Sequence, residues 1–127
     1  MAQFWTDSVI IYCSNVEASK QWWIEVFECK PAKVPANWDD PLPSDVALKL
    51  PGEAEPVILL SDRVERQRAR LTMSAERPIL FCRKIQRAHE YLESKGASPG
   101  PILDGGGTEF FEVRDPEGNV IEICREP

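Results

Sequence analysis

The sequence predicts an α+β fold made of two βαβββ modules within a single domain. Predicted elements occur in the order strand, helix, strand, strand, strand, and this order then repeats. One shift of 69 residues places Ser8 on Arg77 and Cys13 on Cys82. A chain of 127 residues is also the usual size of one compact domain. We therefore expect a single domain over residues 1–127, with module one at 8–61, a linker at 62–76 and module two at 77–125.

The elements of module one follow from its apolar runs and their boundaries. The run Val9–Cys13 predicts a strand, and Ser14 or Asn15 can cap the helix that follows it. From residue 16 on, a helical period places four residues on one face: Ser19, Trp23, Val26 and Phe27. Prolines restrict residues 29–34 to an edge strand, and residues 45–50 and 56–61 predict two further strands.

Module two repeats this order after a polar linker that contains several arginines. Residues 78–82 predict a strand and residues 85–95 a helix, whose inner face carries Ile85, Ala88 and Leu92. Gly96 suits the position just after a helix, where positive φ is common. Acidic residues interleave with the arginines of the linker, which predicts a solvated segment or an arm that crosses to a second chain.

The final hairpin is the most informative segment. Asp115, Pro116 and Gly118 have the chemistry of a type I turn closed by a residue with positive φ, between two apolar runs. In the second run Glu122 stands between two isoleucines, so alternation places its carboxylate on the opposite face of the sheet. A carboxylate on a face that lines a cavity is a candidate functional group.

Composition excludes several classes of protein. The net charge of −6 argues against nucleic acid as the main partner. No apolar segment reaches about 18 residues, and no basic stretch precedes an apolar run at the amino end. We therefore expect no membrane partner and no signal peptide. The four cysteines lack metal-binding spacing, and we expect buried free thiols in a cytoplasmic protein.

The hairpin and both helices carry a resemblance to a known superfamily. The segment Phe111-x-Val113-x-Asp115-Pro116-x-Gly118-Asn119-x-Ile121-Glu122 resembles the terminal signature of the vicinal-oxygen-chelate superfamily, which includes glyoxalase I, extradiol dioxygenases, and fosfomycin and bleomycin resistance proteins. Two helix segments are also similar to that superfamily: Asn15-Val16-Glu17-Ala18-Ser19-x-x-Trp22-Trp23 and His89-Glu90-Tyr91-Leu92-x-x-x-Gly96-Ala97. One departure is Glu28, where relatives usually carry a glycine. The resemblance implies a curved, cavity-bearing mixed sheet of glyoxalase/bleomycin-resistance-like form, and a homodimer.

The resemblance also implies positions for a metal, and these do not carry suitable ligands. Catalytic members of the superfamily bind a divalent metal through His or Glu on four strands. By register these positions fall on Ser8, Leu59, Arg77 and Glu122, of which only Glu122 matches. Leucine cannot coordinate a metal, arginine repels one, and a serine hydroxyl is a poor ligand. The only histidine, His89, lies within the second helix and is expected to be a partly buried flank residue. We therefore expect no cofactor, with a divalent metal as the disfavoured alternative.

Strand alternation predicts a mostly apolar pocket with a few polar groups, which is the usual composition of a small-molecule site. The predicted ligand-binding residues are Ser8, Tyr12, Trp38, Leu59, Arg77, Phe81, Phe110 and Glu122. Phe110 and Phe111 alternate faces, and the sequence does not decide which of them lines the pocket. A pair between Arg77 and Glu122 would be either a polar anchor in place of the missing cation or a plain ion pair at the rim.

Three functions remain open at this point. The first is a protein similar to the bleomycin resistance branch, which binds a small aromatic or cationic molecule in a metal-free cavity and catalyses no reaction. The second is a metal-dependent glyoxalase- or dioxygenase-type enzyme with a non-standard ligand set, to which Glu76, Glu109, Glu112 or a second chain would contribute. The third is an interaction module with a vestigial cavity. We favour the first function, and no catalytic residue is assigned.

Overall fold

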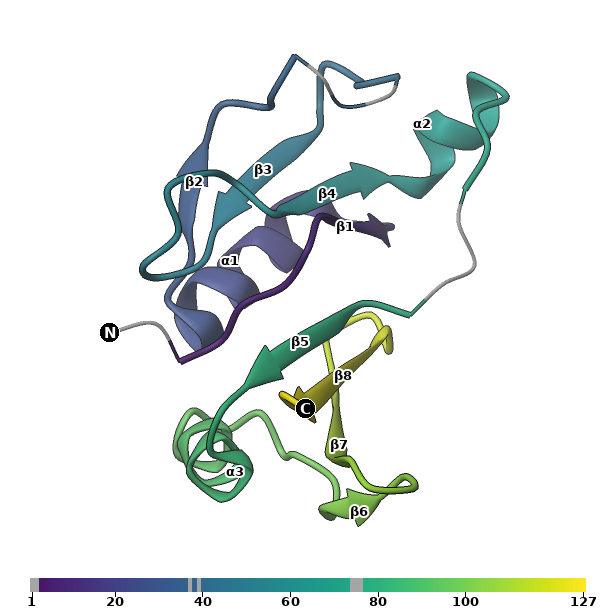
Figure 1. The fold of residues 1–127 in the computed structure, drawn as a ribbon. Helices are drawn as coiled ribbons and strands as arrows, with labels where there is room; N and C mark the ends of the chain where they lie inside the picture. The colour runs from purple at the N-terminus through teal and green to yellow at the C-terminus, as the bar shows by residue number, and fades with distance from the viewer. Residues whose placement is uncertain (1–2, 37, 39, 74–76) are drawn as a thin grey trace.

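The computed structural model describes residues 3–36, 38, 40–73 and 77–127 (Figure 1). Its first half contains β1 (Val9–Cys13), α1 (Val16–Phe27), β2 (Lys30–Ala32), β3 (Val46–Lys49) and β4 (Ile58–Asp62). A short helix, α2 (Arg63–Arg68), follows directly. The second half contains β5 (Ile79–Cys82), α3 (Ile85–Ser94), β6 (Leu103–Asp104), β7 (Glu109–Arg114) and β8 (Val120–Arg125). The predicted order of strands and helices is therefore confirmed, with α2 as an addition.

Each half forms its own four-stranded mixed sheet with the same strand order. The first sheet runs β1-β4-β3-β2 and the second runs β5-β8-β7-β6. In each sheet the first and last strands of the module pair in parallel, and the other neighbours are antiparallel. The two sheets are curved and do not close into a barrel (Figure 1). The α+β class and the two βαβββ modules are thus confirmed.

One face of each sheet packs against helices, and the two packed faces share a core. Ile11 of β1 and Ile123 of β8 are buried on this face. The buried residues of α1 and α3 are those that the helical period predicts. The buried apolar residues of both modules form one cluster. The apolar surface of each module is therefore removed from water partly by the other module, which favours folding of the chain as one unit.

The segment before β1 joins the modules along the edge of the second sheet. Trp5 and Phe81 exchange backbone hydrogen bonds, with N···O distances of 3.1 and 2.7 Å. Thr6 Oγ1 donates to the carbonyl of Ile79 at 2.6 Å. The rings of Trp5 and Phe81 stack with their centroids 6.4 Å apart. These contacts satisfy backbone groups that an edge strand otherwise leaves unpaired.

The β7–β8 turn also joins the modules, because Glu117 in this turn caps α1. Its carboxylate accepts hydrogen bonds from the backbone N–H groups of Ser14 and Asn15, at 2.5 and 3.1 Å, and from the Ser19 hydroxyl at 3.1 Å. A carboxylate here satisfies helix donors that lack an intrahelical partner and interacts favourably with the helix dipole. Burial alone would raise the pKa of Glu117, but these hydrogen bonds outweigh burial and lower the pKa.

The turn itself has the geometry that its sequence predicts. Asp115 Oδ1 accepts from the N–H groups of Glu117 and Asn119, at 3.0 and 2.8 Å. The Gly118 N–H donates to the Asp115 carbonyl at 3.0 Å, and φ of Gly118 is 83°. The Asn119 side chain donates to the carbonyl of Tyr12 in β1 at 3.2 Å. The signature turn thus both closes the hairpin and contacts module one.

Two helix ends carry the expected capping residues, and the carboxyl end of α1 carries Glu28 where glycine is usual in the superfamily. The Asn15 side chain caps α1 by accepting a hydrogen bond from the backbone N–H of Ala18. Gly96 follows α3 with φ of 76°. Glu28 is the residue that caps the carboxyl end of α1, and its φ of 56° lies in the left-handed region that favours glycine. The Tyr91 hydroxyl donates to the Val26 carbonyl at 2.8 Å and lies 3.3 Å from the Glu28 carboxylate. Burial and the nearby carboxylate raise the pKa of Tyr91 to about 12.

The cysteines are free, as their spacing predicts. Cys13, Cys29 and Cys82 are buried, and Cys124 is half-buried. Burial raises the pKa of Cys29 to about 12 and the pKa of each of the other three thiols to about 11. The thiolate, which is the reactive form, is therefore a minor species at neutral pH.

The sequence also predicts no membrane-spanning segment. Among the described residues, no helix is long and apolar enough to cross a membrane.

Candidate functional site

The face of the second sheet that points away from the core remains partly exposed. Alternate residues of β5, β7 and β8 lie on this face and are half-buried: Ile79, Phe81, Phe110, Glu112, Val120, Glu122 and Cys124. We call these seven residues the open face. Their sequence neighbours Phe111 and Ile123 are fully buried in the core. The structure therefore decides between the two phenylalanines, because Phe110 lies on the open face and Phe111 does not.

Glu122 lies within the open face, where no described residue serves as its cationic partner. The β-sheet register places it opposite Glu112 of β7 and beside Ile79 of β5. The Cys124 thiol donates to Glu122 Oε1 at 3.5 Å. Among the described residues no cation forms an ion pair with Glu122. Glu122 is thus a half-buried carboxylate that lies opposite a second carboxylate and, among the described residues, accepts a hydrogen bond only from a weak donor.

Arg77 forms an ion pair with Glu112 rather than with Glu122. Its Nη1 atom lies 2.7 Å from Glu112 Oε2, and the two side chains are 60% and 41% exposed. The predicted pair between Arg77 and Glu122 is therefore wrong. The two glutamates are cross-strand neighbours on one face, so alternation alone could not show which of them Arg77 would bind. An exposed pair of this kind contributes little to stability, but it neutralises Glu112 and leaves Glu122 available.

On the corresponding face of the first sheet, the residues of β4 are fully buried. Leu59 of β4 is fully buried, although it does not belong to the core cluster on the helix side. Ser61, two residues further along β4, is also fully buried, and its hydroxyl donates to Asp45 Oδ1 at 2.6 Å. Leu59 was predicted to contact a ligand, but in this conformation other parts of the chain already cover it. The two sheets therefore differ in how much of this face a ligand can reach.

A buried ion pair holds α2 against the end of the first sheet. Arg66 Nε donates to Ser61 Oγ at 2.5 Å, and Arg66 Nη2 lies 3.4 Å from Asp45 Oδ2. The Arg66 and Asp45 side chains are only 4% and 0% exposed. Arg66 Cζ also lies 6.0 Å from the centroid of the Tyr12 ring. The linker is thus not the fully solvated segment that its composition predicts. Asp62, which caps α2, is the one sequence signal for this helix.

The structure brings together only part of the predicted site. Phe81, Phe110 and Glu122 share the open face, whereas Tyr12 lies beside Arg66 at the first sheet. Two more predicted ligand contacts lie elsewhere: Ser8 is exposed before β1, and Trp38 is half-buried in the loop between β2 and β3. The aromatic residue that sequence reasoning left out is Trp5, which stacks on Phe81.

The positions that the resemblance implies for a metal do not fit one in this chain. Ser8 is exposed, Leu59 has no donor atom, and Arg77 is a cation bound to another carboxylate, so Glu122 stands alone. Within the described part of the chain, no group of three or more His, Cys, Asp or Glu side chains could hold a metal ion. The donor set therefore lacks the three or four ligands that a protein usually supplies to such a metal.

Two other candidate ligands, Glu109 and His89, already have hydrogen-bond partners. Glu109 pairs with Arg125 at 2.9 Å, and Glu76 lies outside the described residues. His89 has Nε2 2.8 Å from the Gly100 carbonyl oxygen and Nδ1 3.2 Å from a glutamate of the same helix. His89 is half-buried on the flank of α3, as the sequence predicts.

Comparison with solved structures identifies the class of fold. A member of the glyoxalase/bleomycin resistance protein/dioxygenase superfamily from Sphaerobacter thermophilus aligns with a TM-score of 0.71 and 21% identity, covering 96% of this chain and 97% of that one. A glyoxalase/bleomycin resistance protein/dioxygenase from Nocardioides gives 0.66 and 17%, covering 94% and 81%. A lactoylglutathione lyase from Agrobacterium tumefaciens gives 0.64 and 13%, covering 94% and 92%.

The chain therefore has the fold of the glyoxalase/bleomycin resistance/dioxygenase superfamily. No protein-family model matches the sequence, and no curated protein matches it. At these identities the likeness establishes the fold alone, because one fold supports many activities. Function must be argued from the residues of this chain.

Proposed function

We propose that the chain binds a small aromatic or cationic molecule on the open face, without a metal ion and without catalysing a reaction. The observation that carries this proposal is Glu122, a half-buried carboxylate that shares its face with apolar and aromatic side chains. Its neighbour Glu112 is paired with Arg77, whereas no cation among the described residues pairs with Glu122. A carboxylate partly removed from water loses solvation, and a ligand cation would restore a favourable interaction. Phe81 and Phe110 on the same face supply aromatic surface for such a ligand.

We also propose that the protein is a homodimer in which a second copy packs on the apolar surface beside the open face. Leu103 of β6 pairs in register with Phe110 and is 50% exposed, so it extends the apolar surface beyond the open face. Contiguous exposed apolar surface commonly marks an interaction site. Sedimentation should give a dimer for the wild type and a larger monomer fraction for Leu103→Glu. A cytoplasmic location and the absence of a nucleic acid partner remain predictions from the composition.

The binding proposal is tested with matched ligands and matched variants. Isothermal titration should show that an aromatic amine binds more tightly than its neutral alcohol analogue. Glu122→Gln should weaken binding of the amine about tenfold and leave the alcohol unaffected, because only a charge is removed. Glu90→Gln removes the same charge from an exposed position of α3 and serves as the control. Equal affinities of wild type and Glu122→Gln for the amine would contradict the proposal.

The metal-dependent alternative is tested on the same protein after chelation. A ligand that binds the folded state raises the melting temperature by mass action. Zn²⁺, Ni²⁺, Mn²⁺ and Fe²⁺ should each leave the melting temperature of the stripped protein unchanged. A saturable rise with one metal bound per chain would contradict the metal-free part of the proposal and favour an enzyme with a non-standard ligand set.

A further inference from the structure

A row of side chains on the first sheet already holds a buried guanidinium group. Tyr12 of β1 lies opposite Ser61 of β4, and the Ser61 hydroxyl donates to the Asp45 carboxylate at 2.6 Å. Arg66 of α2 lies over this row, with Nε donating to Ser61 Oγ and Nη2 3.4 Å from Asp45 Oδ2. Its Cζ atom lies 6.0 Å from the centroid of the Tyr12 ring. The guanidinium thus contacts an aromatic ring, a hydroxyl and a carboxylate at once.

The second sheet carries the same three kinds of group on the open face. The shift of 69 residues places Tyr12 on Phe81. Phe81 lies opposite Cys124 of β8, so a thiol stands where the first sheet has the hydroxyl of Ser61. The Cys124 thiol donates to Glu122 Oε1 at 3.5 Å, as the hydroxyl in module one donates to a carboxylate. This carboxylate comes from β8 itself, whereas the one in module one directly precedes β3. A ring, a short hydrogen-bonding side chain and a carboxylate therefore recur in module two.

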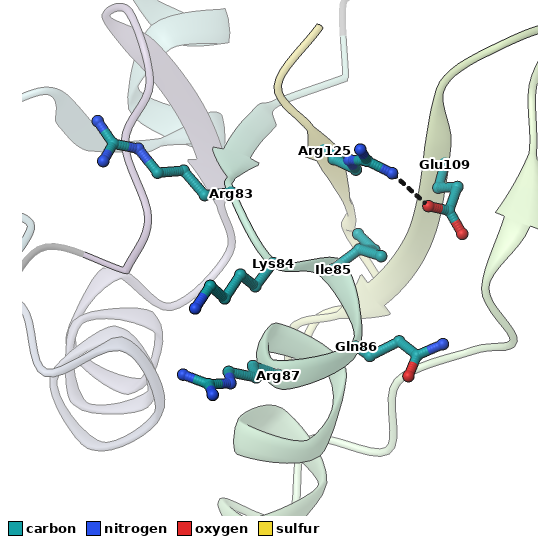
Figure 2. A pocket seen from close by; sticks show the side chains of 7 residues that line it. All are labelled: Arg83, Lys84, Ile85, Gln86, Arg87, Glu109 and Arg125. Atoms are coloured by element: carbon teal, nitrogen blue, oxygen red, sulfur yellow. Dashed lines mark hydrogen bonds and ion pairs between the residues drawn. The ribbon is translucent and has the colours of Figure 1, made fainter.

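The charge of the open face matches one monovalent cation. Three arginines near this face already have carboxylate partners: Arg77 with Glu112, Arg83 with Glu126 and Arg125 with Glu109. Figure 2 shows the pair of Arg125 and Glu109 in a depression whose walls include the first turn of α3. Among the described residues no cation pairs with Glu122, so this carboxylate leaves one negative charge on the open face.

We propose that the open face binds the guanidinium group of a small molecule, with Glu122 as the ionic partner and Phe81 as the ring on which the group stacks. This inference rests on the proposed function and narrows its ligand from cations in general to guanidinium compounds. A guanidinium is planar, so it can lie against an aromatic ring while its edge donates to a carboxylate. It is also more weakly hydrated than an ammonium group and loses less on entering a half-buried site. Trp5, whose ring stacks on Phe81, extends the aromatic surface for the rest of the ligand.

The test compares three benzyl compounds that differ only in their polar group: benzylguanidine, benzylamine and benzyl alcohol. Each compound is titrated calorimetrically into the full chain at constant ionic strength. We expect benzylguanidine to bind about tenfold more tightly than benzylamine, because only the planar cation can donate two parallel hydrogen bonds to Glu122. The largest amide shifts that benzylguanidine causes in ¹H–¹⁵N spectra should lie at residues 79–82 and 120–124.

Two variants separate the roles of the carboxylate and the ring. Glu122→Gln should weaken binding of benzylguanidine about tenfold and leave benzyl alcohol unaffected, while the exposed control Glu90→Gln changes neither. Phe81→Leu keeps an apolar side chain and should reduce the preference for benzylguanidine over benzylamine, because leucine offers no ring for stacking. If Phe81 only shaped the sheet, its replacement would weaken all three compounds in the same proportion, and that result would contradict the stacking role.

The outcomes distinguish this inference from the proposed function. Equal affinities for benzylguanidine and benzylamine, both above that for benzyl alcohol, would overturn the guanidinium assignment and leave the proposed function intact. Cations that bind no more tightly than the alcohol would contradict both. A preference for benzylguanidine that survives unchanged in Glu122→Gln and in Phe81→Leu would show that the group binds elsewhere, which also overturns the assignment.

Discussion

Replacing Glu117 by glutamine tests the contact through which module two caps α1. The carboxylate accepts three hydrogen bonds, from the N–H groups of Ser14 and Asn15 and from the Ser19 hydroxyl. Hydrogen bonds to charged groups contribute about 1.5–3 kcal/mol each. Glutamine keeps one acceptor oxygen but directs an NH₂ donor at the remaining donors. Because Asn15 is exposed and water can solvate its N–H, we expect a loss of about 2–4 kcal/mol, less than the sum of the bonds.

The loss is measured by urea unfolding. The midpoint should fall while the slope with denaturant stays constant, since the surface exposed on unfolding does not change. In a domain of this size each kcal/mol also lowers the melting temperature by about 3–5 °C. Glu90→Gln, with the same change of charge at an exposed position, should remain within about 0.5 kcal/mol of wild type. A Glu117→Gln variant as stable as that control would refute the capping role.

The stability difference between wild type and Glu117→Gln should depend on pH. The pKa of Glu117 is lowered from its ordinary value of 4.5, so the folded state holds this carboxylate charged more strongly than the unfolded state does. Its contribution is therefore fully present above the unfolded pKa and is lost as the pH falls through the folded pKa. The difference in stability between wild type and Glu117→Gln should be constant from about pH 6 to 8 and should shrink below about pH 4.5. A difference that does not change with pH would exclude the charge as its source.

Three further predictions concern other parts of the chain. Glu28→Gly should raise the free energy of unfolding by about 0.5–1 kcal/mol in urea. Glycine removes the cost of a left-handed backbone, about 1–2 kcal/mol, and the loss of the weak hydrogen bond from Tyr91 cancels only part of this gain. A lower urea midpoint for Glu28→Gly would contradict this prediction. Arg66→Ala should lower the free energy of unfolding by about 3–5 kcal/mol in thermal unfolding, since it leaves Asp45 charged and buried. The double variant Arg66→Met/Asp45→Asn should recover much of this loss. A loss below about 1 kcal/mol for Arg66→Ala would contradict a stabilising buried pair. A thiol reagent at pH 8 should label less than one cysteine per native chain within minutes, and all four cysteines in urea. The reason is that burial raises the pKa of every thiol to about 11 or 12. Rapid labelling of Cys124 in the native chain would show that its thiolate is more accessible than the structure indicates.

The sequence was sufficient wherever a feature depends on residues close together in the chain. The inner faces of α1 and α3 follow from the helical period, and the type I turn at Asp115 follows from the chemistry of four consecutive residues. Alternation also placed Glu122 on the face opposite its isoleucine neighbours. Each of these features is set by local geometry, and tertiary packing did not override it.

The sequence was insufficient where a side chain selects one of several distant partners. Arg66 carries the same charge as its arginine neighbours, and only the position of Asp45 across the first sheet makes it the buried one. Arg77 lies near two glutamates of identical chemistry, and its choice of Glu112 depends on atomic positions that alternation does not specify. Likewise, no pattern within the chain indicates that other segments cover Leu59 while Glu122 remains reachable.

The cap that Glu117 supplies to α1 also has a consequence for the order of events in synthesis. Ser14 and Glu117 are separated by 103 positions, so this contact cannot form until the β7–β8 turn has been synthesised. A nascent chain that has emerged only as far as the linker would hold α1 without its carboxylate cap and with the shared apolar surface uncovered. Contacts of such long sequence separation slow folding and prolong the exposure of aggregation-prone intermediates. The first half of this chain therefore completes its core only after the β7–β8 hairpin has left the ribosome.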